Sequence, residues 1–280
     1  MRLRVLTFNV QHDAGHSRRT SLLNRELQRL APGLVALQEV CYPDQWDQLA
    51  ELVADTGLKT THQADVLGYV PPLAEQYGGT AVASRWPHRV VQVVGQPQIE
   101  ATDLHWWTLA VSVQLPDLGE LLFITPTSAW RLDAEAARER QALEVTDLDA
   151  RHRAVLPTII AGDFNATPEA ASIRYLSGLQ TLSGRSAHYH DAWAAAGDEP
   201  GYTWYEDNAA AAVEIDEVVQ QRGHRVRIDY VFVGSAPAHP RARARIVAAQ
   251  LVGDRLVDGV WLSDHAGVLV DLDIEMTDPL

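Results

Sequence analysis

The stretch Pro157-Thr-Ile-Ile-Ala-Gly-Asp-Phe-Asn165 combines a buried-strand pattern with polar side chains at its end. Its first half is apolar and β-branched, which is typical of a strand inside a sheet. We expect Gly162 to end that strand. Asp163 and Asn165 follow two residues apart, so in an extended chain their side chains leave on the same side. Two interpretations are open at this point: an Asx turn that closes a strand, or a pair of site residues.

The composition is that of an ordinary globular protein, with 46% hydrophobic and 21% charged residues among 280. The net charge is 23 minus 37, or −14, which argues against a broad basic surface for long nucleic acid. No uninterrupted apolar run approaches the roughly 20 residues that a membrane span needs. The first residues enter a strand pattern without a signal-peptide series, and the single cysteine, Cys41, allows no internal disulfide. We therefore expect a cytoplasmic protein.

Strand patterns and helix patterns alternate along the chain. Apolar runs predict strands at residues 4–10, 34–38, 80–84, 90–94, 107–113, 121–125, 157–161, 227–233, 244–252 and 266–273. Helices are predicted after a cap at Ser17 up to Leu30, from Pro43 to Val53, and at residues 132–151, 168–176 and 191–196. Residues 59–72 are polar and rich in turn formers.

This alternation predicts the fold class α/β, with four layers in the order α/β/β/α. Two mostly antiparallel sheets are expected to pack face to face, with helices outside. No linker or change of composition divides residues 1–280, so the prediction is a single domain. Residues 206–223 combine alanines with acidic residues, and they are interpreted either as a surface insertion or as a helical lid over a site.

Acidic and amide side chains recur at the ends of the predicted strands. They are Asn9, Glu39, Asp163, Asn165, Asp229 and the pair Asp264-His265. A hard cation such as Mg²⁺ is held by oxygen ligands and keeps several waters, so Glu39 and Asp264 are sufficient to bind it. His265 held by Asp229 has the composition of a general base. With Asp163 on an attacking water and Asn9 and Asn165 on phosphate oxygens, the set predicts in-line hydrolysis of a phosphate ester.

Six short motifs follow one another at these strand ends. They are Phe8-Asn9-Val10, Gln38-Glu39-Val40, Gly162-Asp163-Phe164-Asn165, Tyr202-Thr203-Trp204, Arg227-Ile228-Asp229-Tyr230 and Ser263-Asp264-His265. In this order, from about residue 3 to residue 273, the chain resembles the endonuclease/exonuclease/phosphatase superfamily. The resemblance implies the DNase I-like sandwich and Mg²⁺- or Mn²⁺-dependent hydrolysis of phosphodiesters or phosphomonoesters.

The same resemblance implies a role for each matching residue. Glu39 and Asp264 are metal ligands, with Asn9 close to metal and phosphate. The roles implied for the remaining residues are that Asp163 and Asn165 position nucleophile and phosphate, and that Asp229 orients His265.

The chain departs from the family pattern after the strand at residues 121–125. Members commonly carry Thr-His-Leu there, with a histidine that contacts the phosphate or serves the leaving group. This chain continues as Pro126-Thr127-Ser128-Ala129-Trp130-Arg131. Three explanations are open: Thr127 or Ser128 replaces the contact, the leaving group needs no acid, or the protein binds without catalysis. Because the metal and base motifs are intact, the sequence favours an active enzyme.

We therefore predict a divalent-metal-dependent hydrolase of phosphate esters, either a phosphodiesterase, a nuclease or a phosphatase, with the phosphodiesterase favoured. Catalytic roles are predicted for Asp163, His265, Asp229 and Asn165. Substrate contacts are predicted for Asn9, Asn165, Thr127 and Trp204. The alternatives are a non-catalytic member that binds a phosphorylated ligand, and an enzyme with altered chemistry. The acidic balance favours a small molecule, a nucleotide or a short nucleic acid over duplex DNA.

Overall fold

The computed structural model describes residues 1–43, 46–71, 77–95 and 107–277. One sheet contains β1 (Arg2–Asn9), β2 (Leu34–Val40), β3 (Lys59–His62), β4 (Gly79–Ser84), β13 (Ala242–Val252) and β14 (Gly267–Met276). The other contains β5 (His88–Gly95), β6 (Trp107–Leu115), β7 (Gly119–Thr125), β8 (Ile159–Asp163), β9 (Tyr189–Asp191) and β12 (Asp229–Gly234). A separate pair is formed by β10 (Trp204–Tyr205) and β11 (Arg225–Val226).

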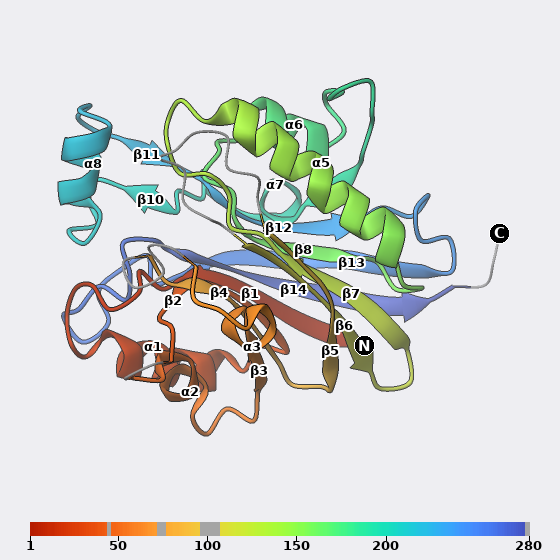
Figure 1. Cartoon of the computed structure of the whole chain (residues 1–280), viewed down its shortest axis with the longest axis horizontal. Helices are drawn as coiled ribbons and strands as arrows, with labels where there is room; N and C mark the ends of the chain where they lie inside the picture. The colour runs from red at the N-terminus through yellow and green to blue at the C-terminus, as the bar shows by residue number, and fades with distance from the viewer. Residues whose placement is uncertain (44–45, 72–76, 96–106, 278–280) are drawn as a thin grey trace.

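The described helices are α1 (Arg19–Leu30), α2 (Gln48–Val53), α3 (Ala64–Leu67), α5 (Glu135–His152), α6 (Ala171–Leu176), α7 (Ala192–Ala196) and α8 (Ala212–Val218). Figure 1 shows α1 and α2 outside one sheet and α5 and α6 outside the other, with β10, β11 and α8 at one end of the sandwich. Among the described residues no helix has the length and hydrophobicity needed to cross a bilayer.

The sheets have the neighbour orders β13-β14-β1-β2-β4-β3 and β5-β6-β7-β8-β12-β9. Within them β1 and β2 run parallel, as do β7 and β8, while the other neighbours are antiparallel. The facing surfaces of the two sheets share one core, which includes Val5, Leu34, Phe123 and Val231. The predicted four-layer α/β/β/α sandwich is therefore confirmed.

Several local expectations are wrong, and each has a physical reason. The polar, turn-rich stretch that begins at Lys59 also holds β3, which pairs with β4, and the short helix α3, neither of which was predicted. The helix expected at Pro43 begins at Gln48 instead, where the Asp47 side chain accepts the N–H of Ala50 at 2.9 Å. Ser17 does not cap α1, since the N-cap is Arg18 and makes no side-chain cap bond.

Gly162 lies inside β8 and does not end it. It pairs with Tyr230 of β12, and Asp163 is the last residue of the strand. A Cβ atom at Gly162 would lie 2.1 Å from the carbonyl oxygen of Pro126. The glycine therefore allows the chain that follows β7 to lie close against β8, and it does not break the strand. That approach lets the Ser128 N–H donate to the carbonyl of Asp163 at 2.9 Å.

A buried carboxylate near the end of α5 ties that helix to the strand that carries Asp163. The Asp149 carboxylate accepts the hydroxyl of Thr158 at 2.6 Å, the hydroxyl of Tyr189 at 2.7 Å and the Arg153 guanidinium at 2.5 Å. Burial alone would raise the pKa of Asp149, but these partners outweigh it and hold the pKa below its usual value. Asp149 thus fixes the start of β8 against α5.

Replacing Asp149 with alanine is expected to lower the free energy of unfolding by about 2–4 kcal/mol, because the buried hydroxyls of Thr158 and Tyr189 lose their acceptor. A depressed carboxyl pKa stabilises the fold above the unfolded value, so the contribution is present above about pH 4 and is lost as the pH falls. Urea unfolding at several pH values measures both effects. Asp147 lies on the same helix as Asp149, and Asp147→Ala removes its half-exposed pair with Arg185, which is expected to cost less than about 1 kcal/mol. Equal losses in the two variants would contradict the prediction.

Candidate active site

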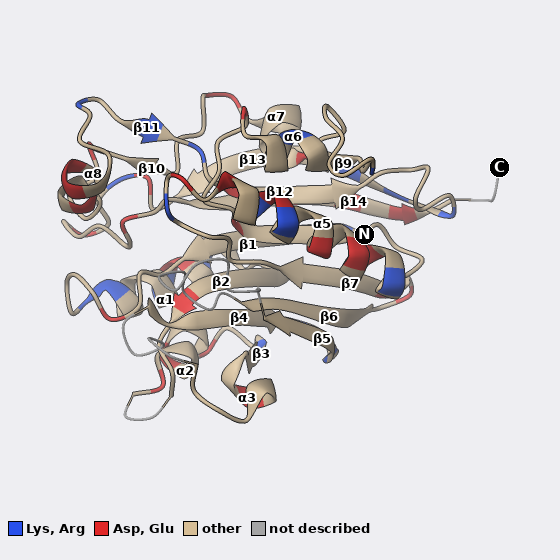
Figure 2. Cartoon of the chain, turned by 45° about the horizontal axis from the view of Figure 1, so that its top comes forward, with Lys and Arg blue, Asp and Glu red and all other residues tan. Residues whose placement is uncertain are grey.

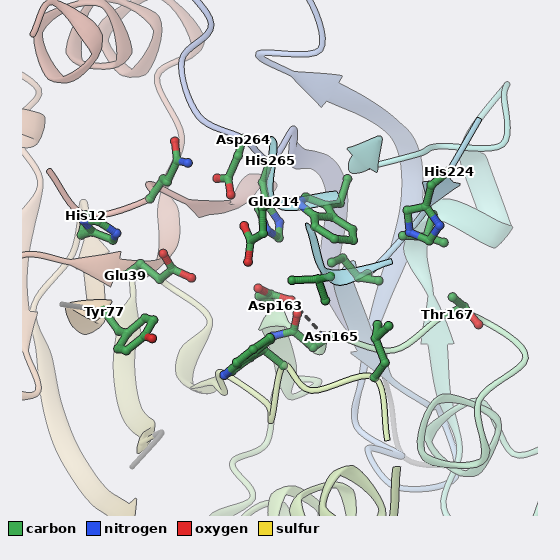
Figure 3. A pocket seen from close by; sticks show the side chains of 17 residues that line it. His12, Glu39, Tyr77, Asp163, Asn165, Thr167, Glu214, His224, Asp264 and His265 are labelled. Atoms are coloured by element: carbon green, nitrogen blue, oxygen red, sulfur yellow. Dashed lines mark hydrogen bonds between the residues drawn. The ribbon is translucent and has the colours of Figure 1, made fainter. Parts of the chain in front are cut away.

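Side chains from distant parts of the chain meet at a cleft of about 250 Å³. Glu39 comes from β2, Asp163 from the end of β8, and Asp264 and His265 from the loop before β14. Figure 3 shows these side chains directed toward one another, together with Asn165. The structure therefore brings most of the sequence-predicted residues to one place.

Glu39 is turned toward the cleft by an irregularity in β2. The pairing with β4 shifts between Leu37 and Val40, and Glu39 has a φ of 58°. Gly78 makes room for this backbone, because a Cβ there would lie 2.6 Å from the carbonyl carbon of Glu39. A bulge of this kind redirects one side chain without ending the sheet. The sequence signal for it is Gly78 itself, which also has a positive φ.

Asn9 connects the two halves of the site. Its Nδ2 donates to Glu39 Oε1 at 3.0 Å and to Asp163 Oδ2 at 3.1 Å, and its Oδ1 accepts the N–H of Gln11 at 3.0 Å. Asn9 is 1% exposed and is not among the described residues that line the cleft. Of the three predicted metal ligands, Glu39 and Asp264 thus line the cleft. Asn9 does not, and it connects the carboxylates of Glu39 and Asp163 through its amide.

His265 is held by a buried carboxylate, as the sequence predicted. Its Nδ1 lies 2.9 Å from Asp229 Oδ2, which leaves Nε2 as the ring nitrogen available to the cleft. Burial opposes the charged ring, but the carboxylates of Asp229, Asp264 and Asp163 outweigh it and raise the pKa of His265 well above its usual value. The Oδ1 atom of Asp229 is buried without a hydrogen-bond partner, so the charge of this aspartate is balanced mainly through His265.

The two carboxylates nearest to Asn9 both resist ionisation. Burial, followed by the charge of Asp264, raises the pKa of Glu39 to about 8. Burial, followed by the charge of Asp229, raises the pKa of Asp163 to about 7. No Lys or Arg is found among the described residues that line the cleft. A site with this much uncompensated negative charge favours a cation.

Asp163 and Asn165 form a turn and also line the cleft. Asp163 Oδ1 accepts the N–H of Asn165 at 2.9 Å, which is the bond of an Asx turn. Asn165 has a φ of 48°, so the chain is not extended there and the expected same-side geometry is wrong. Its Nδ2 donates to the carbonyl of Ser128 at 3.0 Å. The turn nevertheless leaves both side chains lining the cleft.

The two other predicted substrate contacts differ in where they lie. Trp204 lines the cleft and its backbone forms a bridge with His265. Thr127 is 1% exposed, its hydroxyl lies 2.9 Å from that of Thr80, and it is not among the described lining residues. Ser128 is also buried and absent from that lining. Neither residue therefore occupies the place of the missing histidine in the cleft.

Three positioning residues were not found from the sequence. Asn208 Nδ2 donates to the carbonyls of Ser263 and Asp264, each at 2.9 Å. Thr203 Oγ1 accepts the N–H groups of Ile228 and Asp229 at 3.0 and 3.2 Å, although its motif was recognised. Arg19 is buried and donates to the carbonyls of Val10 and Leu262 at 2.8 and 3.0 Å. Such contacts leave no trace in a local pattern, because their partners are far away in the chain.

A further group of side chains has the composition of a metal site. One ligand atom each from Asp163, Asp229 and His265 lies within 4.8 Å of the other two, and all three residues are buried. The hydrogen bond between His265 and Asp229 already commits two of these residues to each other. Glu39 and Asp264 are the other two carboxylates of the centre, and both line the cleft.

The fold and this carboxylate–histidine centre define a class of protein, namely an α/β sandwich hydrolase of the phosphoesterase or nuclease type. The chain belongs to the Endonuclease/Exonuclease/phosphatase family, whose model matches residues 6–265. The resemblance of the six motifs is therefore confirmed. No curated protein sequence matches the chain.

Solved structures with this fold match nearly the whole chain. An endonuclease/exonuclease/phosphatase from Bacteroides vulgatus has a TM-score of 0.72 and 16% identity, covering 98% of this chain and 100% of that one. D. rerio TDP2 complexed with single strand DNA product has 0.68 and 20%, covering 97% and 99%. The human Nocturnin catalytic domain with bound sulfate has 0.65 and 18%, covering 99% and 94%. At these identities the similarity shows the fold.

Proposed function

We propose that the protein is a divalent-metal-dependent phosphodiesterase that attacks a phosphate ester with water in line with the leaving group. The observation that carries the proposal is the buried Asp229–His265 pair, 2.9 Å apart, opening on the same cleft as Asp163, Glu39 and Asp264. A single oriented histidine, a second carboxylate and a pair of oxygen ligands are the parts that this reaction requires. Family membership supports the same class of reaction.

Glu39 and Asp264 are the residues we propose as holders of the metal ion. Burial, followed by the charge of Asp264, raises the pKa of Glu39 to about 8, and a divalent cation between the two carboxylates would stabilise their ionised forms. Gln11 also lines the cleft, and its Oε1 atom is buried without a hydrogen-bond partner. This uncharged amide oxygen is a third candidate donor beside the two carboxylates. An all-oxygen donor set fits Mg²⁺ or Mn²⁺. A bound cation would neutralise charge on the phosphate.

We propose a separate role in the reaction for each of Asp163, His265 and Asn165. The Asn9 amide and the Asn165 N–H orient the Asp163 carboxylate. We propose that this carboxylate orients the attacking water and accepts its proton. The other ring nitrogen of His265, Nε2, donates to a phosphoryl oxygen, because three carboxylates stabilise the protonated ring. Asn165 Nδ2 has one hydrogen left for the phosphate after its bond to Ser128.

The position of Thr127 favours one explanation for the missing histidine. Its hydroxyl is directed to Thr80 rather than to the cleft, so it offers the leaving group no proton. Because an activated leaving group needs no general acid, we propose a substrate whose alcohol leaves as a stable anion, or receives its proton from water.

Hydrolysis of bis(4-nitrophenyl) phosphate tests the proposal. We expect turnover with Mg²⁺ or Mn²⁺, a loss of at least about 100-fold on addition of EDTA, and recovery when the metal is returned. Glu39→Gln is expected to raise the metal concentration for half-maximal rate by at least about tenfold, since even the loss of a side chain that only holds a metal ligand in place costs about 10–100-fold in affinity. Glu26→Gln, which removes an exposed pair with Arg29 on α1, serves as the control.

Assays on a wider panel of substrates would distinguish the two alternatives. Absence of turnover on DNA, nucleotides, inositol phosphates and phospholipids with both metals would favour a non-catalytic phospho-ligand-binding protein. A product formed by breaking a bond outside the phosphate group would favour altered chemistry on the same scaffold. Activity that EDTA leaves unchanged would contradict the assignment of Glu39 and Asp264.

A further inference from the structure

We infer that Glu214 on α8 selects the charge of the group that is esterified to the phosphate, so that the cleft accepts an uncharged apolar or aromatic group and rejects an anionic one. The inference rests on the proposed phosphodiesterase function and adds the class of substrate. A nucleic acid chain or a molecule with several phosphates is thereby disfavoured. The chain segment concerned is residues 206–223, for which an insertion and a lid were both open from the sequence.

The segment is a fixed wall of the cleft. Ala211 and Ile215 are buried against Trp204 and Ile228 in one apolar cluster. Asn208, 0% exposed, holds the carbonyls of Ser263 and Asp264. Residues packed and hydrogen-bonded in this way move little on their own. A side chain on the cleft side of α8 therefore stays close to the reacting centre.

The half of the cleft beside α8 is apolar. Trp204, Ile228, Val226 and Val218 line it, and His224 packs edge-on against Trp204 with ring centroids 5.3 Å apart. Figure 3 shows His224 on the opposite side of Asp163 from His12, Tyr77 and Glu39. Burial lowers the pKa of His224, so its ring adds no fixed positive charge. An aromatic wall of this kind binds a flat apolar group.

Glu214 adds a negative charge to that apolar half. Four carboxylates line the cleft, those of Glu39, Asp163, Glu214 and Asp264, and no Lys or Arg is found among the described lining residues. A divalent cation and the protonated ring of His265, which also lines the cleft, offset three of these four charges, so a net negative charge remains in the lining. Burial, followed by the charge of Asp264, raises the pKa of Glu214, and the charge of His265 acts in the opposite direction. A second anionic group on the substrate would be repelled by this carboxylate.

α8 also provides the matched control. Figure 2 shows acidic residues, in red, along this helix, which carries Glu214, Asp216 and Glu217. Only Glu214 of the three lines the cleft. Glu217→Gln therefore changes the charge of the helix by the same amount as Glu214→Gln without changing the lining. A general effect of the acidic surface would appear equally in both variants.

The test compares two diesters with the same leaving group, 4-nitrophenyl phenyl phosphate and its 4-carboxyphenyl counterpart. The wild type is expected to prefer the uncharged phenyl group by about tenfold in kcat/KM, the size of one like-charge contact in a partly hydrated site. Glu214→Gln removes most of the preference, Glu214→Lys reverses it, and Glu217→Gln retains it. Thermal unfolding of each variant checks that the fold is intact.

Binding is measured independently of turnover. The ligands are monomethyl phenylphosphonate and its 4-carboxy derivative, whose P–C bond is not hydrolysed. Calorimetric titration of the protein with each ligand, in the presence of Mg²⁺, gives the ratio of their Kd values. A wild-type ratio near one, or a ratio that neither Glu214 variant changes, overturns the inference. Loss of turnover on both diesters overturns the phosphodiesterase function instead, and the Kd ratio still decides the charge selection.

Discussion

His265→Asn is expected to lower kcat/KM for an aryl phosphodiester by about 10³-fold, within the range of general acid–base and oriented-donor effects. The asparagine amide nitrogen takes the position of Nδ1 and can still donate to the buried Asp229 carboxylate, whereas His265→Ala would leave that carboxylate without its partner at 2.9 Å. Asparagine therefore separates lost chemistry from lost stability. The readout is steady-state kinetics with saturating metal, together with the melting temperature.

Asp163→Asn gives an independent measure of the same centre and is expected to cost about 10³-fold as well. Because burial and the charge of Asp229 already raise the pKa of Asp163 to about 7, removing its charge costs little stability. The two substitutions combined are expected to cost much less than the product of the single effects, since the residues act as a unit. Full activity in either single variant would contradict the proposed mechanism.

Gly162→Ala is expected to have the largest effect on stability, with a loss above about 4 kcal/mol in the free energy of unfolding. The added Cβ would lie 2.1 Å from the backbone oxygen of Pro126, and neither backbone is free to move, because β8 pairs on both sides. Urea unfolding followed by circular dichroism measures the loss. Relief of the clash would also separate Ser128 from Asp163 and shift the Asn165 turn.

Gly119→Ala is the matched control for this prediction. Gly119 has a φ of +98°, but a Cβ there would meet no atom within 4 Å. Its substitution therefore carries backbone strain without a clash and is expected to cost about 1–2 kcal/mol. If the two alanine variants were equally stable, close approach would not be the reason for the glycine in β8.

The position of Thr127 shows why one missing residue is hard to interpret from sequence. The family histidine is absent, and Thr127 was the natural replacement by position. The structure places its hydroxyl against Thr80, a residue 47 positions away in the chain. Side-chain direction at this point depends on the pairing of the chain after β7 with Asp163, which is a tertiary contact. Sequence position alone could not distinguish a residue near the cleft from one that faces it.

Asn208 and Glu214 are a second case of this kind. The segment 206–223 is charged and alanine-rich, and such segments are most often solvated surface. Its function depends on which residues face inward, and that is determined by packing of Ala211 and Ile215 against Trp204. The helical spacing of Ile215 and Val219 was a signal for the buried face, but it did not identify what the face packs against.

The sequence by itself determined the sandwich class and the main candidates for the site. Strand periodicity and apolar helix faces are local patterns, so most strands and helices could be predicted. Polar residues at the ends of predicted strands could be identified as site candidates without knowing how the sheets pack. Only the tertiary structure decided the bulge at Glu39, the role of Gly162, the Asn9 link and the inward face of α8. Each of these depends on atoms that approach from residues far apart in the chain. Close approach, burial and charge are properties of the folded arrangement and have no period in the sequence.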